Sequence, residues 1–192
     1  MYKAVVVGVS MGGMHALQSI LSGINQSFSL PLLIVQHQSA QYKSNLAELL
    51  NRTCPLTVVD ACSGDVIQPN HVYIAPAGYH LLVEKDKTIA LSVDNPVNYS
   101  IPSIDVLFES AAEAYKETLI GVVLTGANHD GSQGLKTIKT YGGLTVVQDP
   151  KTAEAAQMPT SAINLTQPAH IVPLDEISDF LNKLCTDNAC VE

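Results

Sequence analysis

Continuous apolar runs rich in valine, isoleucine and leucine alternate along this chain with segments of helical period. The first two runs cover residues 3–9 and 30–36, and a third of the same kind covers residues 119–125. Runs that are apolar at every position are typical of parallel strands covered on both faces. Parallel strands need crossover connections, so the helical segments between them indicate βαβ units. The expected fold class is α/β, a mostly parallel, doubly wound open sheet.

The remaining segments complete this pattern, with one departure in the middle of the chain. Short strand candidates at residues 71–75, 80–84 and 88–93, with a polar Lys85-Asp86-Lys87 turn before the last, predict a small antiparallel hairpin excursion. Further strands are expected at residues 57–61 and 144–148, and helices at residues 14–21, 45–50, 104–115, 131–141 and 175–184. Ser103 is the expected N-cap of the helix that starts at residue 104. With no linker, repeat or low-complexity tract, residues 1–192 are expected to form one domain.

Charge and hydropathy exclude several classes of function. A formal net charge of −8 leaves no excess of lysine and arginine for general binding to nucleic acid. No apolar stretch approaches the roughly 20 residues that span a bilayer, so direct membrane insertion is not expected. The apolar N-terminal run is broken by Gly8, Ser10 and Gly12 without a signal-peptide cleavage site after it.

Cysteine usage favours a reducing compartment. The four cysteines form no CxxC pair, and in a chain without a secretion signal they indicate reduced thiols rather than disulfides. They are Cys54, Cys62, Cys185 and Cys190. The expected location is the cytoplasm.

Residues that could take part in catalysis follow three of the predicted strands. Ser10 follows the first strand, His37 the second, and Asp130 lies in the glycine-rich loop after residues 119–125. In open α/β sheets, functional groups collect beyond the carboxyl ends of the strands. The sequence therefore predicts a serine, a histidine and an aspartate on one edge of the sheet.

The segment Gly8-Val9-Ser10-Met11-Gly12-Gly13 has the form GxSxGG at a strand-to-helix turn. Glycines on both sides of Ser10 allow a sharp turn that exposes its hydroxyl, as in a nucleophile elbow, and the helix N-terminus behind it suits a developing oxyanion. Taken alone, the same turn also fits a phosphate-binding loop. A dinucleotide fingerprint needs glycine where Ser10 stands, and the P-loop lysine is absent, so both departures weaken the nucleotide alternative.

His37 and Asp130 each have an ordinary alternative role. His37 alone fits a plain histidine at a strand end, and Asp130 alone fits an N-cap for the helix that follows it. Together with Ser10 they supply the nucleophile, base and orienting carboxylate of a catalytic triad. His129, adjacent to Asp130, and His15, on the first helix, are weaker candidates for the base. The histidines show no metal-ligand spacing, so neither a metal nor a cofactor is expected.

The chain also resembles a known family in several motifs, in collinear order over residues 3–175. The motifs are Gly8 to Gly13, Val35-Gln36-His37, Ile74-Ala75-Pro76, Pro102 to Phe108, Leu124-Thr125-Gly126 with Asp130-Gly131, Gln148-Asp149-Pro150 and Met158-Pro159. Their combination is similar to the catalytic domain of the bacterial chemotaxis receptor protein-glutamate methylesterase, the CheB type.

This resemblance implies a Ser-His-Asp hydrolase that removes methyl groups from glutamyl methyl esters on chemoreceptor helices, and that deamidates some receptor glutamines. By position, Ser10 is the nucleophile, His37 the general base and then acid, and Asp130 the orienting carboxylate. Backbone N–H groups near Met11 and Ala127 correspond to the family's oxyanion donors. Two other hypotheses stay open: an esterase or amidase with another substrate, and a catalytically silent domain that binds a receptor.

Three departures from the family pattern bear on the substrate and on the regulation. Gly126-Ala127-Asn128 stands where the family usually has Gly-Met-Gly, and Ser100-Ile101 where it usually has His-Arg. The second change removes a positive side chain near the site, which affects the receptor sequence recognised more than the reaction. No receiver domain precedes the first strand, as in a stand-alone domain or a fragment. The cognate receptor, the regulation and the oligomeric state are not indicated by the sequence.

Overall fold

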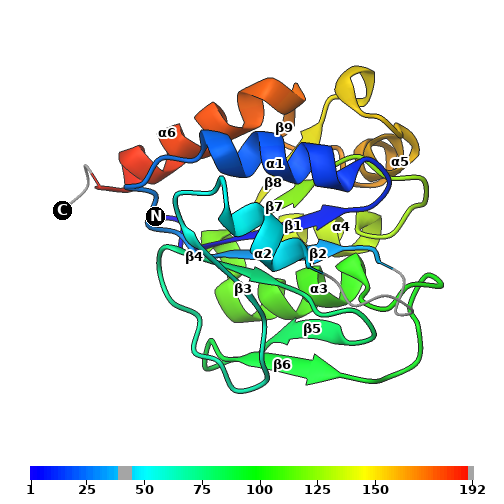
Figure 1. Cartoon of the computed structure of the whole chain (residues 1–192). Helices are drawn as coiled ribbons and strands as arrows, with labels where there is room; N and C mark the ends of the chain where they lie inside the picture. Colours follow the sequence, from blue (N-terminus) through cyan, green and yellow to red (C-terminus); the bar gives the residue numbers. More distant parts are fainter. Residues whose placement is uncertain (39–44, 190–192) are drawn as a thin grey trace.

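The computed structural model describes residues 1–38 and 45–189, and its centre is a seven-stranded sheet (Figure 1). Every neighbouring pair of strands in this sheet is parallel. In spatial order the strands are β3 (Thr57–Asp60), β4 (His71–Ile74), β2 (Leu32–Gln36), β1 (Ala4–Val9), β7 (Leu119–Val123), β8 (Leu144–Gln148) and β9 (His170–Val172). The predicted α/β class with a doubly wound parallel sheet is confirmed.

Helices cover both faces of the sheet. One face carries α1 (Gly13–Gly23), α2 (Leu46–Asn51) and α6 (Ile177–Ala189), and the other carries α3 (Ile104–Tyr115), α4 (Ser132–Thr140) and α5 (Gln157–Thr166). Figure 1 shows α1 and α6 on one side of the strands and α3 on the other. Three short 3₁₀ helices join these elements: η1 (Lys116–Thr118), η2 (Pro150–Thr152) and η3 (Leu174–Glu176).

The two helical layers explain why β1 is apolar at every position. Val5 and Val7 belong to the core under α1, whereas Ala4 and Val6 belong to the core under α3. Successive side chains of a strand point to opposite faces, so a strand covered twice cannot carry a polar face. All six residues of β1 are buried.

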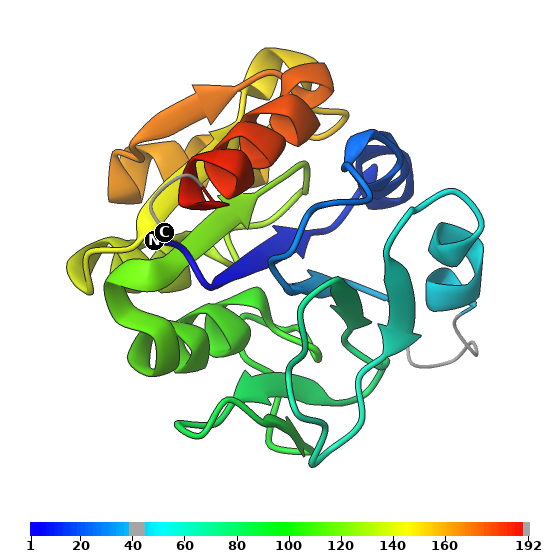
Figure 2. The same ribbon diagram turned by 90° about the vertical axis from the view of Figure 1, so that its left-hand side faces the viewer.

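The middle of the chain differs from the sequence prediction in one strand. Residues 71–75 were expected in the antiparallel excursion, but β4 lies in the main sheet, parallel to both β2 and β3. Val72 and Ile74 enter one core and Tyr73 the other, the pattern of a strand covered on both faces. Only β5 (His80–Val83) and β6 (Ile89–Ser92) form the hairpin, which packs below α3 (Figure 2).

Two elements, α5 and β9, were not anticipated. The strand has only three residues, and the helix begins with Gln157-Met158-Pro159, where proline occupies the first turn.

Among the described cysteines, Cys54, Cys62 and Cys185 are free thiols, and Cys190 lies outside the described residues. None of the helices in the described part of the chain is long and apolar enough to cross a membrane.

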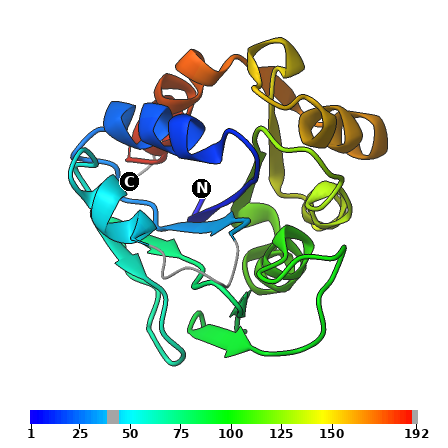
Figure 3. The same cartoon turned by 45° about the vertical axis from the view of Figure 1, so that its right-hand side comes forward.

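The strand order determines where the site forms. β1 lies between β2 and β7, so the segments that leave these three strands emerge side by side (Figure 3). They contain Ser10, His37 and Asp130, respectively.

Candidate active site

Ser10 sits in a tight turn between β1 and α1. Its N–H donates to the carbonyl of Thr125 at 2.9 Å, and its carbonyl accepts from the N–H of Gly13 at 2.9 Å. Gly12 has φ +77°, a left-handed conformation that side chains rarely adopt. The turn therefore requires glycine at this position, in agreement with the motif.

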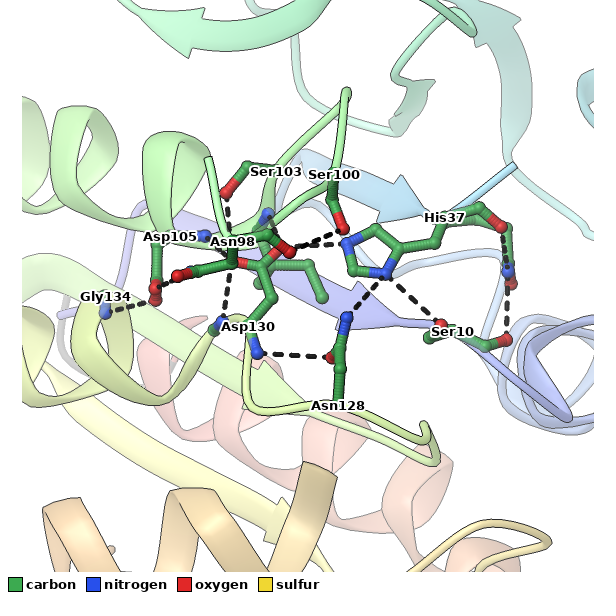
Figure 4. Close-up of polar contacts among 12 residues, drawn as sticks. Ser10, His37, Asn98, Ser100, Ser103, Asp105, Asn128, Asp130 and Gly134 are labelled. Atoms are coloured by element: carbon green, nitrogen blue, oxygen red, sulfur yellow. Dashed lines mark hydrogen bonds and ion pairs between the residues drawn. The ribbon is translucent and has the colours of Figure 1, made fainter. Parts of the chain in front are cut away.

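The structure brings the three predicted residues together in one hydrogen-bonded row (Figure 4). His37 Nδ1 lies 3.2 Å from Ser10 Oγ, and His37 Nε2 lies 2.8 Å from Asp130 Oδ2. A carboxylate only accepts hydrogen bonds, so Nε2 carries the proton and donates it in the hydrogen bond to Asp130. Nδ1 is therefore unprotonated, and its lone pair faces the serine hydroxyl. This is the arrangement that a nucleophile, a base and an orienting group require.

Asp130 is fully buried, yet it is held as an anion. Burial by itself would raise the pKa of Asp130, but hydrogen bonds from His37, Asn98 and the backbone outweigh that effect and lower the pKa. Besides His37, its carboxylate accepts from Asn98 Nδ2 at 2.9 Å, Ser103 Oγ at 2.9 Å, Ile104 N at 2.7 Å, Asp105 N at 3.2 Å and Gly131 N at 3.1 Å.

The backbone donors show that Asp130 also caps the N-terminus of a helix. Ile104 and Asp105 begin α3, so the carboxylate of Asp130 lies at the positive end of that helix. Ser103 occupies the predicted N-cap position, but its hydroxyl donates to Asp130 instead of capping α3. The sequence alone also fitted Asp130 as an N-cap for the helix that follows it. In the structure Asp130 caps a different helix, α3, from a loop distant in sequence.

Asn98 is part of the site that sequence reasoning missed. Its Nδ2 donates both to Asp130 Oδ1 and, at 2.7 Å, to Asp105 Oδ2, so it lies between two carboxylates. The residue adopts φ +51°, which asparagine tolerates better than most side chains. It precedes the Pro102 motif by only four positions, but nothing in its local pattern indicates a contact with Asp130.

Asp105 is the second of these carboxylates and was also missed. Its Oδ1 accepts from the N–H of Gly134 at 2.6 Å. Burial raises the pKa of Asp105, and the negative charge of Asp130 raises it further. The two carboxylates are therefore distinct, one with a lowered pKa facing His37 and one with a raised pKa behind it.

Gln36 ties the nucleophile to the base. Its Nε2 donates to the carbonyl of Ser10 and to the carbonyl of His37, both at 2.9 Å. A Cβ added to Gly13 would lie 1.9 Å from Gln36 Oε1, so the glycine leaves room for this amide. A polar residue at the end of a buried strand was the available signal in the sequence.

The backbone N–H groups of Met11 and Ala127 are the predicted oxyanion donors. Within residues 1–38 and 45–189, no group accepts a hydrogen bond from the N–H of Met11 or of Ala127. The hydroxyl of Thr125 donates to the carbonyl of Met11 at 2.8 Å and so fixes that peptide. The role of Met11 and Ala127 as donors stays a prediction.

The other histidines occupy different positions. Among the residues that the structure describes, no hydrogen bond joins the side chain of His129 to the triad, and His129 lines a separate pocket with Asn98, whereas His15 lines the same pocket as Ser10. The side chain next to His129 does approach the base: Asn128 Nδ2 lies 3.4 Å from His37 Nδ1. In the described part of the chain, no cluster of three acidic, histidine or cysteine side chains could hold a metal ion.

Ser10 and His37 open into a pocket of about 690 Å³. Its wall is formed by the start of α1, the end of β2, the start of α2 and the segment after β8. Half of the polar side chains in its described lining are amides, and the lining includes Gln18, Gln36, Gln38, Asn45, Leu49 and Glu154. The pocket is open to a side chain presented by another molecule.

Comparison with known proteins identifies the family. The family model described as CheB methylesterase matches residues 5–181. The chain belongs to the CheB methylesterase family. A crystal structure of the Thermotoga maritima CheB methylesterase catalytic domain superposes with a TM-score of 0.91 at 34% identity, covering 96% of this chain and 99% of that one.

Relatives in the CheB methylesterase family differ in length. A Leptospira interrogans protein named "Putative protein-glutamate methylesterase/protein-glutamine glutaminase" is 48% identical over 187 residues, which is 97% of either chain. A Geobacter metallireducens protein-glutamate methylesterase/protein-glutamine glutaminase is 39% identical over 96% of this chain, but the match spans only 54% of that protein. The chain thus covers nearly all of one relative and about half of the other.

Proposed function

We propose that this protein is a protein-glutamate methylesterase that hydrolyses glutamyl methyl esters with Ser10, His37 and Asp130. The observation that carries the proposal is the hydrogen-bonded row from Ser10 Oγ through the His37 ring to Asp130 Oδ2. Family membership and the names of its relatives support the same reaction. The proposal treats residues 1–192 as a single catalytic domain.

The geometry supports a two-step reaction. Ser10 Oγ attacks the ester carbonyl while its proton moves to His37 Nδ1, and the N–H groups of Met11 and Ala127 receive the oxyanion. The tetrahedral intermediate collapses as His37 returns the proton to the leaving methoxide, which departs as methanol. Water, deprotonated by His37, then cleaves the acyl-enzyme to release the glutamate side chain and restore Ser10.

Asp130 supports both steps without changing its own protonation. It holds the Nε2–H tautomer of His37 and stabilises the imidazolium that forms when Nδ1 takes the proton. With ammonia as the leaving group the same cycle deamidates glutamine, the second activity in the names of the relatives. The proposed partners are methylated helices of chemoreceptors in the cytoplasm, without a cofactor.

Methanol release from receptor labelled on its methyl esters tests this function. Wild type is expected to release methanol, and Ser10→Ala to lose at least about 10⁴-fold in rate, because only oxyanion and binding contributions remain. Ser22→Ala is a matched control, since Ser22 lies exposed near the end of α1, the helix that follows the Ser10 turn, and its hydroxyl donates to the nearby carbonyl of Ser19. It is expected to keep full activity.

Two results would contradict the proposal in different ways. Ser10-dependent turnover of small esters without turnover of receptor would point to an esterase with another substrate. Absence of serine-dependent hydrolysis of any ester would point to a silent receptor-binding domain.

A further inference from the structure

The pocket at Ser10 contains one fixed charge among its described lining residues. Glu154 is the only carboxylate there, and the described lining includes neither lysine nor arginine. Its side chain is exposed and forms no ion pair with another described residue. Among the described lining residues, a molecule that enters this pocket therefore meets amides, apolar groups, two histidines and one negative charge.

The backbone around Glu154 is fastened to the nucleophile turn. The N–H of Ala155 donates to Thr125 Oγ1 at 2.9 Å, and the same hydroxyl donates to the carbonyl of Met11 at 2.8 Å. The carbonyl of Ala155 accepts from the N–H of Gly126 at 2.9 Å. Thr125 thus links the segment that carries Glu154 to the turn that carries Ser10.

The carboxylate itself lies over that turn. A Cβ added to Gly12 would lie 2.9 Å from Glu154 Oε2 and 2.7 Å from Glu154 Cβ. Gly12 is two residues beyond Ser10 and directly precedes α1. The negative charge consequently lies beside Gly12 in the nucleophile turn, on the wall of the pocket that contains Ser10.

From this placement we propose that Glu154 determines substrate specificity. It favours glutamyl methyl esters that are flanked by lysine or arginine on the receptor helix and disfavours those flanked by acidic residues. The proposal rests on the proposed methylesterase function and adds the charge of the preferred substrate. Because Glu154 is exposed, its effect is moderate and falls as salt screens the charge.

Three helical peptides test the proposal, each with one glutamyl methyl ester. Lysine, glutamine or glutamate occupies the positions three and four residues to either side, which share a helix face with the ester. For wild type at about 0.01 M ionic strength, kcat/KM is expected to be about fivefold higher for the lysine peptide than for the glutamate peptide. At about 1 M the screening length falls to about 3 Å, and the ratio is expected to approach one.

Glu154→Gln removes the charge while keeping the shape of the side chain. This variant is expected to give a lysine-to-glutamate ratio near one at both salt concentrations. Glu117→Gln makes the same change in net charge at an exposed residue just before β7, at the opposite edge of the sheet, and is expected to keep the wild-type ratio.

The possible failures are distinguishable. A ratio that is the same in wild type and Glu154→Gln, or a preference for the glutamate peptide, would overturn the role of Glu154 while leaving the methylesterase function intact. If wild type released methanol from none of the peptides and not from methylated receptor either, the proposed function itself would be wrong, and the specificity with it.

Discussion

His37 presents Nε2, not Nδ1, to Asp130, at a distance of 2.8 Å from Oδ2. The ring nitrogen nearer the backbone is consequently the one that faces the nucleophile. In the chymotrypsin arrangement the two nitrogens have the opposite partners. Triads depend on roles and not on a particular nitrogen, so the reversed ring performs the same chemistry if Asp130 fixes the tautomer.

Asp130→Asn tests that condition. The side-chain NH₂ of asparagine would face groups that themselves donate hydrogen bonds to Asp130. The amide also no longer holds the Nε2–H tautomer of His37. We expect methanol release to fall by about 10³- to 10⁴-fold. The free energy of unfolding is also expected to fall by about 2 kcal/mol or more, because buried donors lose their acceptor.

The matched control for this change is Asp149→Asn. Asp149 also accepts from a backbone N–H, that of Lys151, but it is more exposed, and among the described residues it shares no hydrogen bond with the triad. Steady-state kinetics and urea unfolding of both variants separate the two effects. Full activity in Asp130→Asn would reduce Asp130 to a helix cap.

Asn98→Ala is expected to slow methanol release by about tenfold, mainly in kcat, because Asp130 loses a hydrogen bond to its charged form. The bond from Asn98 helps to lower the pKa of Asp130, so its loss raises that pKa. The acidic limb of the kcat profile should therefore move to higher pH. Asn95→Ala, in the same exposed loop, should leave both kcat and the profile unchanged. An unshifted profile in Asn98→Ala would contradict the positioning role.

Gln36→Leu removes the amide that joins the carbonyls of Ser10 and His37. Leucine fills similar space but removes this donor from both carbonyls. The carbonyl of Ser10 keeps the N–H of Gly13, so the cost of about 1–3 kcal/mol for a buried unsatisfied group applies chiefly to the carbonyl of His37. We expect a loss of stability and about a tenfold loss of kcat. Gln133→Leu on the exposed surface of α4 is the control. Wild-type kinetics in Gln36→Leu would show that the turn holds its shape unaided.

Asp105 gives the stability a distinct pH dependence. Its folded pKa is raised, so the native state binds more protons than the unfolded state between about 3.9 and that raised value. The stability of wild type relative to Asp105→Asn should therefore rise as the pH falls from 7 through the raised pKa, and level off below about 3.9. Urea unfolding of both proteins at a series of pH values measures this difference. A difference independent of pH would contradict the raised pKa.

The sequence was sufficient for the parallel α/β class of the sheet and for the grouping of Ser10, His37 and Asp130. Both follow from one rule, since buried parallel strands are apolar throughout and their carboxyl ends share an edge. β4 was misassigned because its neighbours along the chain form a hairpin, and its pairing with β2 depends on contacts distant in sequence.

The supporting residues of the site were harder to predict for a related reason. Asn98 and Asp105 reach Asp130 across gaps of 32 and 25 residues, and no local pattern encodes such contacts. Glu154 was likewise invisible, because its place beside Gly12 depends on how the segment after β8 folds back onto Thr125.

The position of Asp130 at the start of α3 bears on how lost activity can be recognised in related chains. A descendant that no longer cleaved esters would still need this acid to fold, so selection for folding alone would preserve it. The side chains of Ser10 and His37 have no comparable role in folding. Across such descendants, the serine and the histidine should be substituted first. A retained aspartate would then indicate a conserved fold and not a conserved activity.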